Sequence, residues 1–338
     1  MQFHKLTADR FEFECGKAIE NFEIAYHTSP RDYRKGEKVI WICHALTANS
    51  DPEDWWESLV GPGKLIDTEK YFVVCSNMPG SPYGTTSPVS VNPATGKPYY
   101  FDYPDVTTRD IVSSIILVRK ALGIEKVDLL LGSSIGGFYA IEWSIIEPEV
   151  IKKAAFIATT SRVSPYLTAF METQRMAIEA DPTFREAKSP QGGLEGMKCA
   201  RAIALISYRC YEGYDITQKE MDDDAVFAQR AASYERYQGE KLGRRFNAYS
   251  YWYLANCVDS NNAGRGRGGE AAALGSIKAD VTLVAIDTDC IFRPKEIEKM
   301  SEFIPGCKYH VINSLFGHDG FLLEYEQLTK ILKPLIED

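Results

Sequence analysis

The sequence predicts an α/β protein, in which a mostly parallel sheet is flanked by helices and carries one inserted helical segment. Short, continuous apolar runs recur along the 338-residue chain, and segments with apolar residues at helical spacing lie between several of them. Continuous apolar runs are typical of strands that are covered on both faces, as in a parallel sheet. Strands and helices that alternate in this order imply right-handed crossover connections.

The predicted strands are apolar runs rich in the β-branched residues that favour strands. In chain order they are Val39–Cys43, Tyr71–Cys75, Val127–Leu131, Ala154–Ala158, Val281–Ile286 and Tyr309–Asn313. The predicted helices follow the helical spacing of their apolar residues. They are Thr108–Leu122, which ends at Gly123, then Phe138–Ile146, Glu296–Phe303 and Leu322–Ile336.

A long segment in the second half of the chain has no convincing strand pattern. It is rich in helix formers and charged residues, so we expect a helical lid at residues 165–277, inserted between core segments 1–164 and 278–338. Insertions at the carboxyl ends of strands often cover an active site. Gly264–Gly269 matches the glycine spacing of a dinucleotide-binding loop, but no strand precedes it, which favours a mobile, solvated loop.

Composition excludes several classes of protein. The chain has 38 basic and 47 acidic residues, a net charge of −9, and 45% hydrophobic residues, which is typical of a globular protein and not of a disordered one. Net acidity argues against nucleic acid or anionic membranes as partners, because both bind basic surfaces. The sequence has no apolar run long enough to span a membrane and no signal-peptide pattern at its start, so we expect a cytoplasmic protein.

The eight cysteines are spread along the chain without a Cys-x-x-Cys pair. This distribution indicates reduced thiols in the cytosol, not a disulfide framework. The spacing of cysteines and histidines also gives no cluster of zinc ligands, so we expect no metal.

The strongest local motif is Gly132-Ser133-Ser134-Ile135-Gly136, between a predicted strand and a predicted helix. In such a turn the central serine, Ser134, is exposed at the carboxyl edge of the sheet, and side chains at the glycine positions would collide with backbone. The helix N-terminus beside the serine can stabilise a developing negative charge. The motif therefore predicts a nucleophilic Ser134.

A serine nucleophile needs a base and an orienting acid, which follow it along the chain in the order acid, then histidine. Only His310 and His318 follow Ser134, and His310 lies inside a predicted strand, so His318 is the expected base. Asp287 and Asp289 both follow the strand Val281–Ile286, and spacing favours Asp289 only mildly.

An oxyanion hole in this layout uses two backbone N–H donors. One is expected from Ile135, directly after the nucleophile, and the other from the loop His44–Thr47, with Leu46 as the expected residue. His44 is a second candidate base, but a histidine directly after a strand more often positions its loop by hydrogen bonding.

Further motifs are spread through nearly the whole chain. Together with the Ser134 turn they include His44–Thr47, Gly84–Pro88, Ala200-Arg201, Ile206–Arg209, Tyr237–Gly239, Arg245–Tyr251, Thr288-Asp289 and Gly317–Leu322. In this number and order the motifs resemble the homoserine O-acetyltransferase family of α/β-hydrolase-fold acyltransferases. The chain departs from the usual family pattern at Gly80–Tyr83, Ser133, Ile135 and Asn247.

The resemblance implies an α/β-hydrolase fold with a helical lid, and a homodimer formed through that lid. It implies ping-pong transfer of an acetyl group from acetyl-CoA, a co-substrate and not a bound cofactor, to L-homoserine in methionine biosynthesis. It makes Asp289 the orienting acid, and it makes Arg201, Tyr208 and Asp319 the residues that hold the amino acid. A succinyl donor, a serine acceptor and a serine hydrolase with the same triad stay open as alternatives, as does a non-catalytic binding module.

Overall fold

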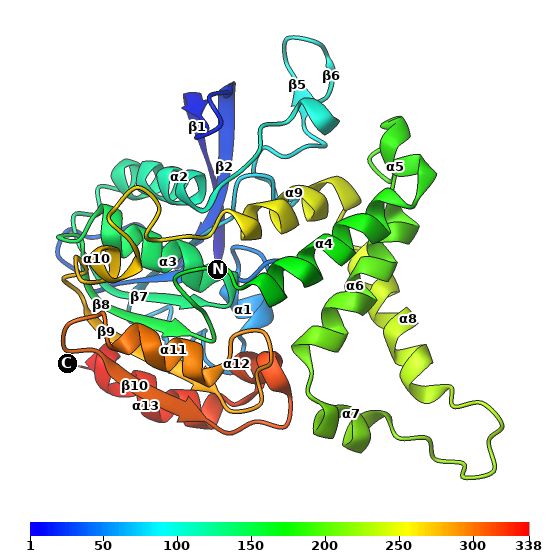
Figure 1. Ribbon diagram of the computed structural model, residues 1–338. Helices are drawn as coiled ribbons and strands as arrows, with labels where there is room; N and C mark the ends of the chain where they lie inside the picture. The colour runs from blue at the N-terminus through cyan, green and yellow to red at the C-terminus, as the bar shows by residue number, and fades with distance from the viewer. Residues whose placement is uncertain (338) are drawn as a thin grey trace.

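The computed structural model describes residues 1–337 and contains, within them, an eight-stranded sheet flanked by helices (Figure 1). Across the sheet the strands run in the order β1-β2-β4-β3-β7-β8-β9-β10. Their bounds are β1 Gln2–Glu12, β2 Ala18–Thr28, β3 Val39–Cys43, β4 Phe72–Ser76, β7 Val127–Ser133, β8 Ile151–Ile157, β9 Asp280–Ile286 and β10 Lys308–Ile312. From β4 to β10 all neighbouring strands are parallel, whereas β1 and β2 pair antiparallel. A small separate hairpin joins β5 Val91–Asn92 to β6 Lys97–Pro98.

The six predicted strands are all present, and β3 illustrates why their apolar runs are continuous. Val39, Trp41 and Cys43 belong to one hydrophobic cluster, which includes residues of α2 (Thr108–Ala121), α3 (Ile135–Ile146) and α11 (Pro294–Ser301). Ile40 and Ile42 belong to a second cluster, with residues of α13 (Tyr325–Glu337). Alternate side chains therefore enter two cores on opposite faces of the sheet, so each position of the strand must be apolar.

The sequence pattern did not predict the β1–β2 hairpin. Most residues of β1 are exposed or half-buried, and many are charged, so the strand has no continuous apolar run. Its buried residue, Phe11, stacks on Phe22 of β2 at a ring separation of 4.6 Å. An edge strand with polar and charged side chains resists pairing with other chains, which explains why its composition differs from that of the central strands.

The predicted terminal helix Leu322–Ile336 is wrong in its continuity. The structure has two helices there, α12 Gly320–Leu323 and α13 Tyr325–Glu337, which are separated at Glu324. The other predicted helices are present with shifted ends, because α3 begins at Ile135 and α11 at Pro294. Short helices occur as well at α1 Pro52–Trp55, η1 Tyr100–Asp102 and η2 Gly317–Asp319.

Between β8 and β9 the chain is helical, and part of it projects away from the sheet (Figure 1). The projecting helices are α4 Pro165–Glu179, α5 Pro182–Glu186, α6 Leu194–Tyr208, α7 Tyr211–Gln218 and α8 Arg230–Gly243. Helices α9 Ala248–Asp259 and α10 Glu270–Leu274 then lead back to the core. On α9, the Tyr253 hydroxyl donates to the carbonyl of Tyr103, a core residue, at 3.1 Å. Helix α9 therefore contacts the core, and the expected end of the lid at residue 277 stays a prediction.

Most residues of the glycine-rich loop 264–269 are exposed, as expected of a solvated loop, but ion pairs hold its two arginines. Arg265 pairs with Glu14 at 2.7 Å, and Arg267 donates to the buried Glu142 at 2.7 Å. These pairs fasten the loop to the start of the chain and to α3. In residues 1–337, no helix is long and apolar enough to cross a membrane.

Candidate active site

The predicted nucleophile lies on a strained turn between β7 and α3. Ser134 has φ 56° and ψ −131°, a backbone conformation that is rare for a residue with a side chain. Such strain costs about 1–3 kcal/mol and persists only where the surrounding structure enforces it. The turn places the Ser134 side chain at the carboxyl edge of the sheet, with 8% of the residue exposed.

The glycines around Ser134 are required by close backbone contacts. A Cβ atom on Gly136 would lie 2.1 Å from the Cys43 carbonyl oxygen, and one on Gly132 would lie 2.6 Å from the Gly136 carbonyl oxygen. The sequence motif predicted both. It did not single out Gly137, where a Cβ atom would lie 2.2 Å from the Thr159 side chain. Any side chain at these positions would push α3 away from the sheet.

The structure brings Ser134, His318 and Asp289 together in one hydrogen-bonded series. His318 Nε2 lies 2.8 Å from Ser134 Oγ, and His318 Nδ1 lies 2.7 Å from Asp289 Oδ2. The second Asp289 oxygen accepts the backbone N–H groups of Ile291 and Phe292, each at 2.9 Å. This carboxylate therefore fixes both the orientation of the imidazole and the loop after β9.

The rival residues occupy other positions. Asp287 Oδ1 accepts the backbone N–H of Ser314 at 2.9 Å and so supports the loop after β10. His310 lies on β10 and is exposed. His44 is fully buried, its Nδ1 lies 2.9 Å from the Ala45 carbonyl oxygen, and burial lowers its pKa to about 4. His44 is therefore a neutral residue that positions the loop after β3.

The two residues expected to form the oxyanion hole, Ile135 and Leu46, both lie near Ser134. Ile135 is the first residue of α3, so its N–H has no partner within the helix. Leu46 lies in the turn after β3, where the Ala48 N–H donates to the Ala45 carbonyl at 3.0 Å, and it lines the same cavity as Ser134. Neither N–H donates to another group of residues 1–337. Both can donate to a bound oxyanion.

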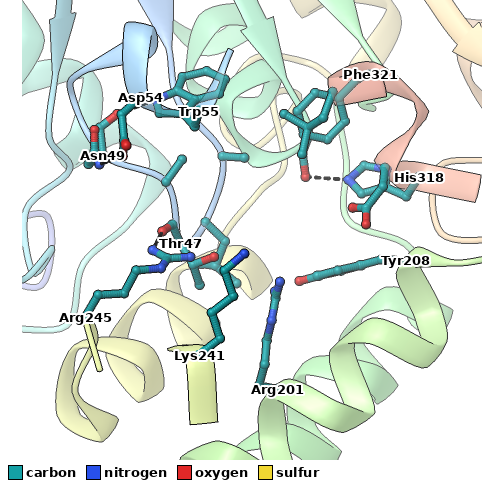
Figure 2. A pocket seen from close by; sticks show the side chains of 16 residues that line it. Thr47, Asn49, Asp54, Trp55, Arg201, Tyr208, Lys241, Arg245, His318 and Phe321 are labelled. Atoms are coloured by element: carbon teal, nitrogen blue, oxygen red, sulfur yellow. Dashed lines mark hydrogen bonds between the residues drawn. The ribbon is translucent and has the colours of Figure 1, made fainter. Parts of the chain in front are cut away.

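A cavity of about 380 Å³ opens beside Ser134 and His318, beneath the projecting helices (Figure 2). Its walls come from the loop after β3, from α1, from η2 and α12, and from lid helices α6 and α8. All three residues that the resemblance assigns to the amino acid, Arg201, Tyr208 and Asp319, line this cavity.

Arg201 points from α6 toward the cavity, and its guanidinium lies 5.7 Å from the centre of the Tyr208 ring (Figure 2). It pairs with no carboxylate of residues 1–337, so its charge is available to an anionic ligand. Desolvation raises the pKa of the Tyr208 hydroxyl, while the Arg201 charge acts in the opposite direction. Tyr208 is therefore protonated at neutral pH and can donate a hydrogen bond.

Asp319 has a partner that sequence reasoning missed. Arg209 Nε lies 3.0 Å from Asp319 Oδ2, although its N–H is not aligned with that oxygen, so the contact is ionic and not a directed hydrogen bond. The Arg209 guanidinium also lies over the Phe316 ring at 5.7 Å. One indication of this role lay in the sequence, because Arg209 directly follows Tyr208, a residue already expected at the site.

Sequence reasoning also missed two cations from the other side of the lid. Lys241 and Arg245 line the cavity at the carboxyl end of α8 (Figure 2). The Arg245 guanidinium donates to the Thr47 carbonyl and to the Tyr83 hydroxyl, which joins α8 to the loop that carries Leu46.

The lid is fastened directly to both loops that carry the acid and the base. Cys210, after α6, donates through Sγ to the Leu315 carbonyl at 3.1 Å, and Cys290, beside Asp289, donates to the Ser207 carbonyl at 3.1 Å. The chain also packs so closely here that a Cβ atom on Gly317 would lie 2.7 Å from the Tyr208 carbonyl oxygen.

Among residues 1–337, no group of three or more His, Cys, Asp or Glu side chains could hold a metal ion. The polar groups around Ser134 instead suit acyl transfer, with a nucleophile, a base, an acid and two oxyanion donors.

Comparisons with known proteins show which family the chain resembles. Residues 38–325 match the family model described as the alpha/beta hydrolase fold. A homoserine O-acetyltransferase from Cyclobacterium marinum is 42% identical over 329 residues, which cover 96% of this chain and 92% of that protein.

Solved structures give the same fold. The homoserine O-acetyltransferase from Bacillus anthracis has a TM-score of 0.90 at 23% identity, covering 100% of this chain and 98% of that one. An acetylester hydrolase from Corynebacterium glutamicum has a TM-score of 0.87 at 23% identity, covering 100% of this chain and 96% of that one. At this identity the two structures establish the fold alone.

Proposed function

Because the chain belongs to the homoserine O-acetyltransferase family of α/β-hydrolase-fold acyltransferases, we propose that it transfers an acetyl group from acetyl-CoA to the hydroxyl of L-homoserine. The observation that carries the proposal is the Ser134–His318–Asp289 series, which faces a cavity with a cation and an anion for an amino acid. The transfer would supply O-acetylhomoserine to methionine biosynthesis.

The first half of the proposed mechanism forms an acyl-enzyme. His318 Nε2 takes the Ser134 proton as Oγ attacks the carbonyl carbon of the thioester. The N–H groups of Ile135 and Leu46 stabilise the oxyanion, and each such donor contributes about 2.7–4 kcal/mol to the barrier reduction. The C–S bond then breaks, the CoA sulfur takes the proton from His318, and an acetyl ester is left on Ser134.

The second half transfers the acetyl group to the acceptor. His318 takes the proton of the acceptor hydroxyl, whose oxygen attacks the Ser134 ester carbonyl. The ester bond to Ser134 breaks, and His318 returns the proton to Ser134 Oγ. Asp289 stabilises the imidazolium at both stages but keeps its own negative charge.

Arg201, Tyr208 and Asp319 are the proposed residues that hold the acceptor. The Arg201 guanidinium can pair with the amino-acid carboxylate, and Asp319 can pair with the α-ammonium. Arg209 is a positioning residue in this scheme, because its ionic contact with one Asp319 oxygen leaves the other oxygen to the ligand. A bound amino acid also displaces water from the acyl-serine, which favours transfer over hydrolysis.

The test follows the intact protein and the small molecules by mass spectrometry after mixing with acetyl-CoA. We expect an acetyl adduct on Ser134 that discharges to O-acetylhomoserine when L-homoserine is added, and no adduct with Ser134→Ala. Discharge only to acetate would contradict the transferase and indicate the hydrolase. An adduct with succinyl-CoA instead, or transfer to L-serine, would correct the donor or the acceptor.

Arg201→Ala separates a transferase from a hydrolase. In a transferase it abolishes acceptor use and leaves acylation of Ser134 intact, because Arg201 serves only the second substrate. Equal turnover with and without homoserine in the parent enzyme would favour the hydrolase. Failure of a fluorophosphonate to label Ser134 would favour a binding module.

We also propose that the protein is a homodimer formed through the lid. The lid exposes many large apolar side chains, which in a water-soluble monomer are usually scattered. They are Tyr166, Met176, Ile206, Tyr211, Ile216, Met221, Val226, Phe227 and Tyr237. The helices that carry most of them project from the sheet (Figure 1).

A reducing compartment fits the cysteines. All eight are free thiols in the structure, and burial raises the pKa of Cys43 and of Cys75. Free thiols in this number are typical of cytosolic proteins, so we propose that the enzyme acts in the cytoplasm.

A further inference from the structure

The cavity lining has three basic residues, Arg201, Lys241 and Arg245, against the two acidic residues Asp54 and Asp319, which leaves an excess of positive charge. An amino acid brings one carboxylate and one ammonium, and Arg201 and Asp319 are opposite in charge to these. Lys241 and Arg245 line the same cavity, and Arg244 lies beside them at the end of α8. Three basic residues within five positions are notable in a chain of net charge −9.

These three cations, the rim cluster Lys241, Arg244 and Arg245, lack acidic partners. None of them pairs with a carboxylate of residues 1–337, whereas Lys198 on neighbouring α6 pairs with both Glu195 and Glu240. Cations at the carboxyl end of a helix are favoured by its dipole. That effect does not explain why Lys241 extends toward the cavity, as Figure 2 shows, and not along the helix into solvent.

The exposure of the charged groups changes along the cavity. Ser134 is buried, Arg201 is half-buried, and all three residues of the rim cluster are exposed. A long donor that carries its reactive acyl group at one end and its charge at the other fits this order. The acyl group would reach Ser134, and the charged end would lie at the exposed rim cluster.

We propose that the rim cluster binds the phosphate groups of the acyl donor. The inference rests on the proposed function, because it takes the donor to be an acyl-CoA, whose negative charge is carried by phosphates. Lys241 and Arg244 supply the main contacts, since Arg245 already donates to Thr47 and Tyr83. Charge-assisted contacts of this kind are stronger than neutral hydrogen bonds.

The test compares thioesters that differ only in their phosphates. Acylation of Ser134 is measured in single turnovers with acetyl-CoA and with S-acetylpantetheine, which has the same acyl end and no phosphate. We expect Lys241→Ala, and more so Lys241→Ala with Arg244→Ala, to lower kcat/KM for acetyl-CoA by about tenfold, the loss of a charge-assisted contact. The rate with S-acetylpantetheine and the KM for homoserine should change less than about twofold, because an exposed charge that contacts neither molecule has only a small effect.

The matched control is Lys188→Ala, which removes an exposed lid lysine that pairs with Glu186 and does not line the cavity. It should leave both thioesters unaffected. Rising salt should weaken acetyl-CoA use more than S-acetylpantetheine use, because salt screens exposed charges. An equal loss with both thioesters, or a raised KM for homoserine, would overturn the phosphate assignment.

Direct binding separates this inference from the proposed function. Calorimetry gives the Kd of CoA and of pantetheine for the parent and for Lys241→Ala. If CoA binds the parent no more tightly than pantetheine, the phosphate site is wrong whatever the enzyme transfers. If CoA binds more tightly and Lys241→Ala removes the difference, yet no O-acetylhomoserine forms, the phosphate site stands and the proposed acceptor is wrong.

Discussion

Two aspartates that are two residues apart have different roles. Asp289 accepts from His318 and from two backbone N–H groups, whereas Asp287 accepts from Ser314 and lies outside the hydrogen-bonded series. The strand before them ends at Ile286, so a shift of two positions decides which carboxylate reaches the imidazole. Strand spacing alone could not resolve that difference.

The two aspartates give a matched pair of variants. Asp289→Asn should lower kcat about 10³- to 10⁴-fold, because the imidazole loses its orientation and its counter-charge. Asp287→Asn keeps an acceptor oxygen for Ser314 and should stay within a few-fold of the parent. Steady-state kinetics measure both, and thermal unfolding shows whether each variant is folded. Equal losses of activity would contradict the assignment of the acid.

His44 should make stability depend on pH. Burial lowers its pKa to about 4 in the folded state, below the unfolded value of 6.5. The unfolded chain therefore binds a proton that the folded chain rejects, so stability falls as pH falls from 6.5 toward 4. The loss from this residue should approach about 3 kcal/mol at the acid end.

Urea unfolding of the parent and of His44→Gln at pH 7 and pH 4 measures this effect. Other groups titrate in both proteins, so the difference between the two proteins isolates His44. The variant should lose less stability than the parent on acidification. A parallel decline in both would show that His44 is already protonated in the folded state.

At the scale of the element, the turn from β7 into α3 is set by backbone contact. The first turn of α3 lies against the end of β3, where the Gly136 position faces the Cys43 carbonyl at a distance that allows no side chain. The Tyr139 hydroxyl donates to the His44 carbonyl at 2.7 Å, one turn further along the same helix. Ser134 and the loop after β3 are thereby held at a fixed separation.

Gly136→Ala should disrupt this contact. We expect a loss of about 3 kcal/mol in the free energy of unfolding, the upper range for overpacking, and loss of acylation of Ser134. Gly123→Ala is the control, because Gly123 has φ +68° and nothing within 4 Å of an added Cβ atom. It should cost only about 1 kcal/mol of left-handed strain and leave activity intact. Comparable stability losses at both sites would contradict the Cys43 contact as the reason for glycine at 136, because the Gly136 backbone is helical and not left-handed.

Prediction from sequence succeeded where a pattern had one physical cause. Strands covered on both faces need continuous apolar runs, so β3 and β7 could be recognised from composition alone. The β1 strand could not be recognised in this way, because an edge strand buries few side chains and so has no continuous apolar run. The break at Glu324 was missed as well, since the apolar spacing continues across the gap between α12 and α13.

At the scale of the whole molecule, the site combines segments far apart in the chain. The order of serine, acid and base was predictable, because the fold returns each strand end to one edge of the sheet. The positions of Arg209 and Lys241 at the site were not predictable, because no repeating pattern in the sequence sets how the lid helices lie against the core. Their places depend on how α6 and α8 pack, which the spacing of charges along a helix does not determine.

The lid's exposed apolar side chains should reveal the proposed dimer in solution. Sedimentation equilibrium should give twice the mass of the chain, and Ile216→Asp with Phe227→Asp should shift it toward the monomer, because charge is costly in an apolar interface. Val91→Asp is the control, since Val91 is 61% exposed on β5, outside the lid. A parent that sediments as a monomer would contradict the dimer.

The thiol contacts from Cys210 and Cys290 join the end of α6 to the two loops that carry the base and the acid. A movement of that end of the lid away from the core would therefore also displace His318 and Asp289. We therefore expect substrates to enter on the α8 side, where the exposed Lys241 side chain lines the cavity and can change rotamer. In the proposed two-step reaction, the α6 end of the lid would stay in place while side chains on the α8 side move, so reactants could exchange without disturbing His318 and Asp289.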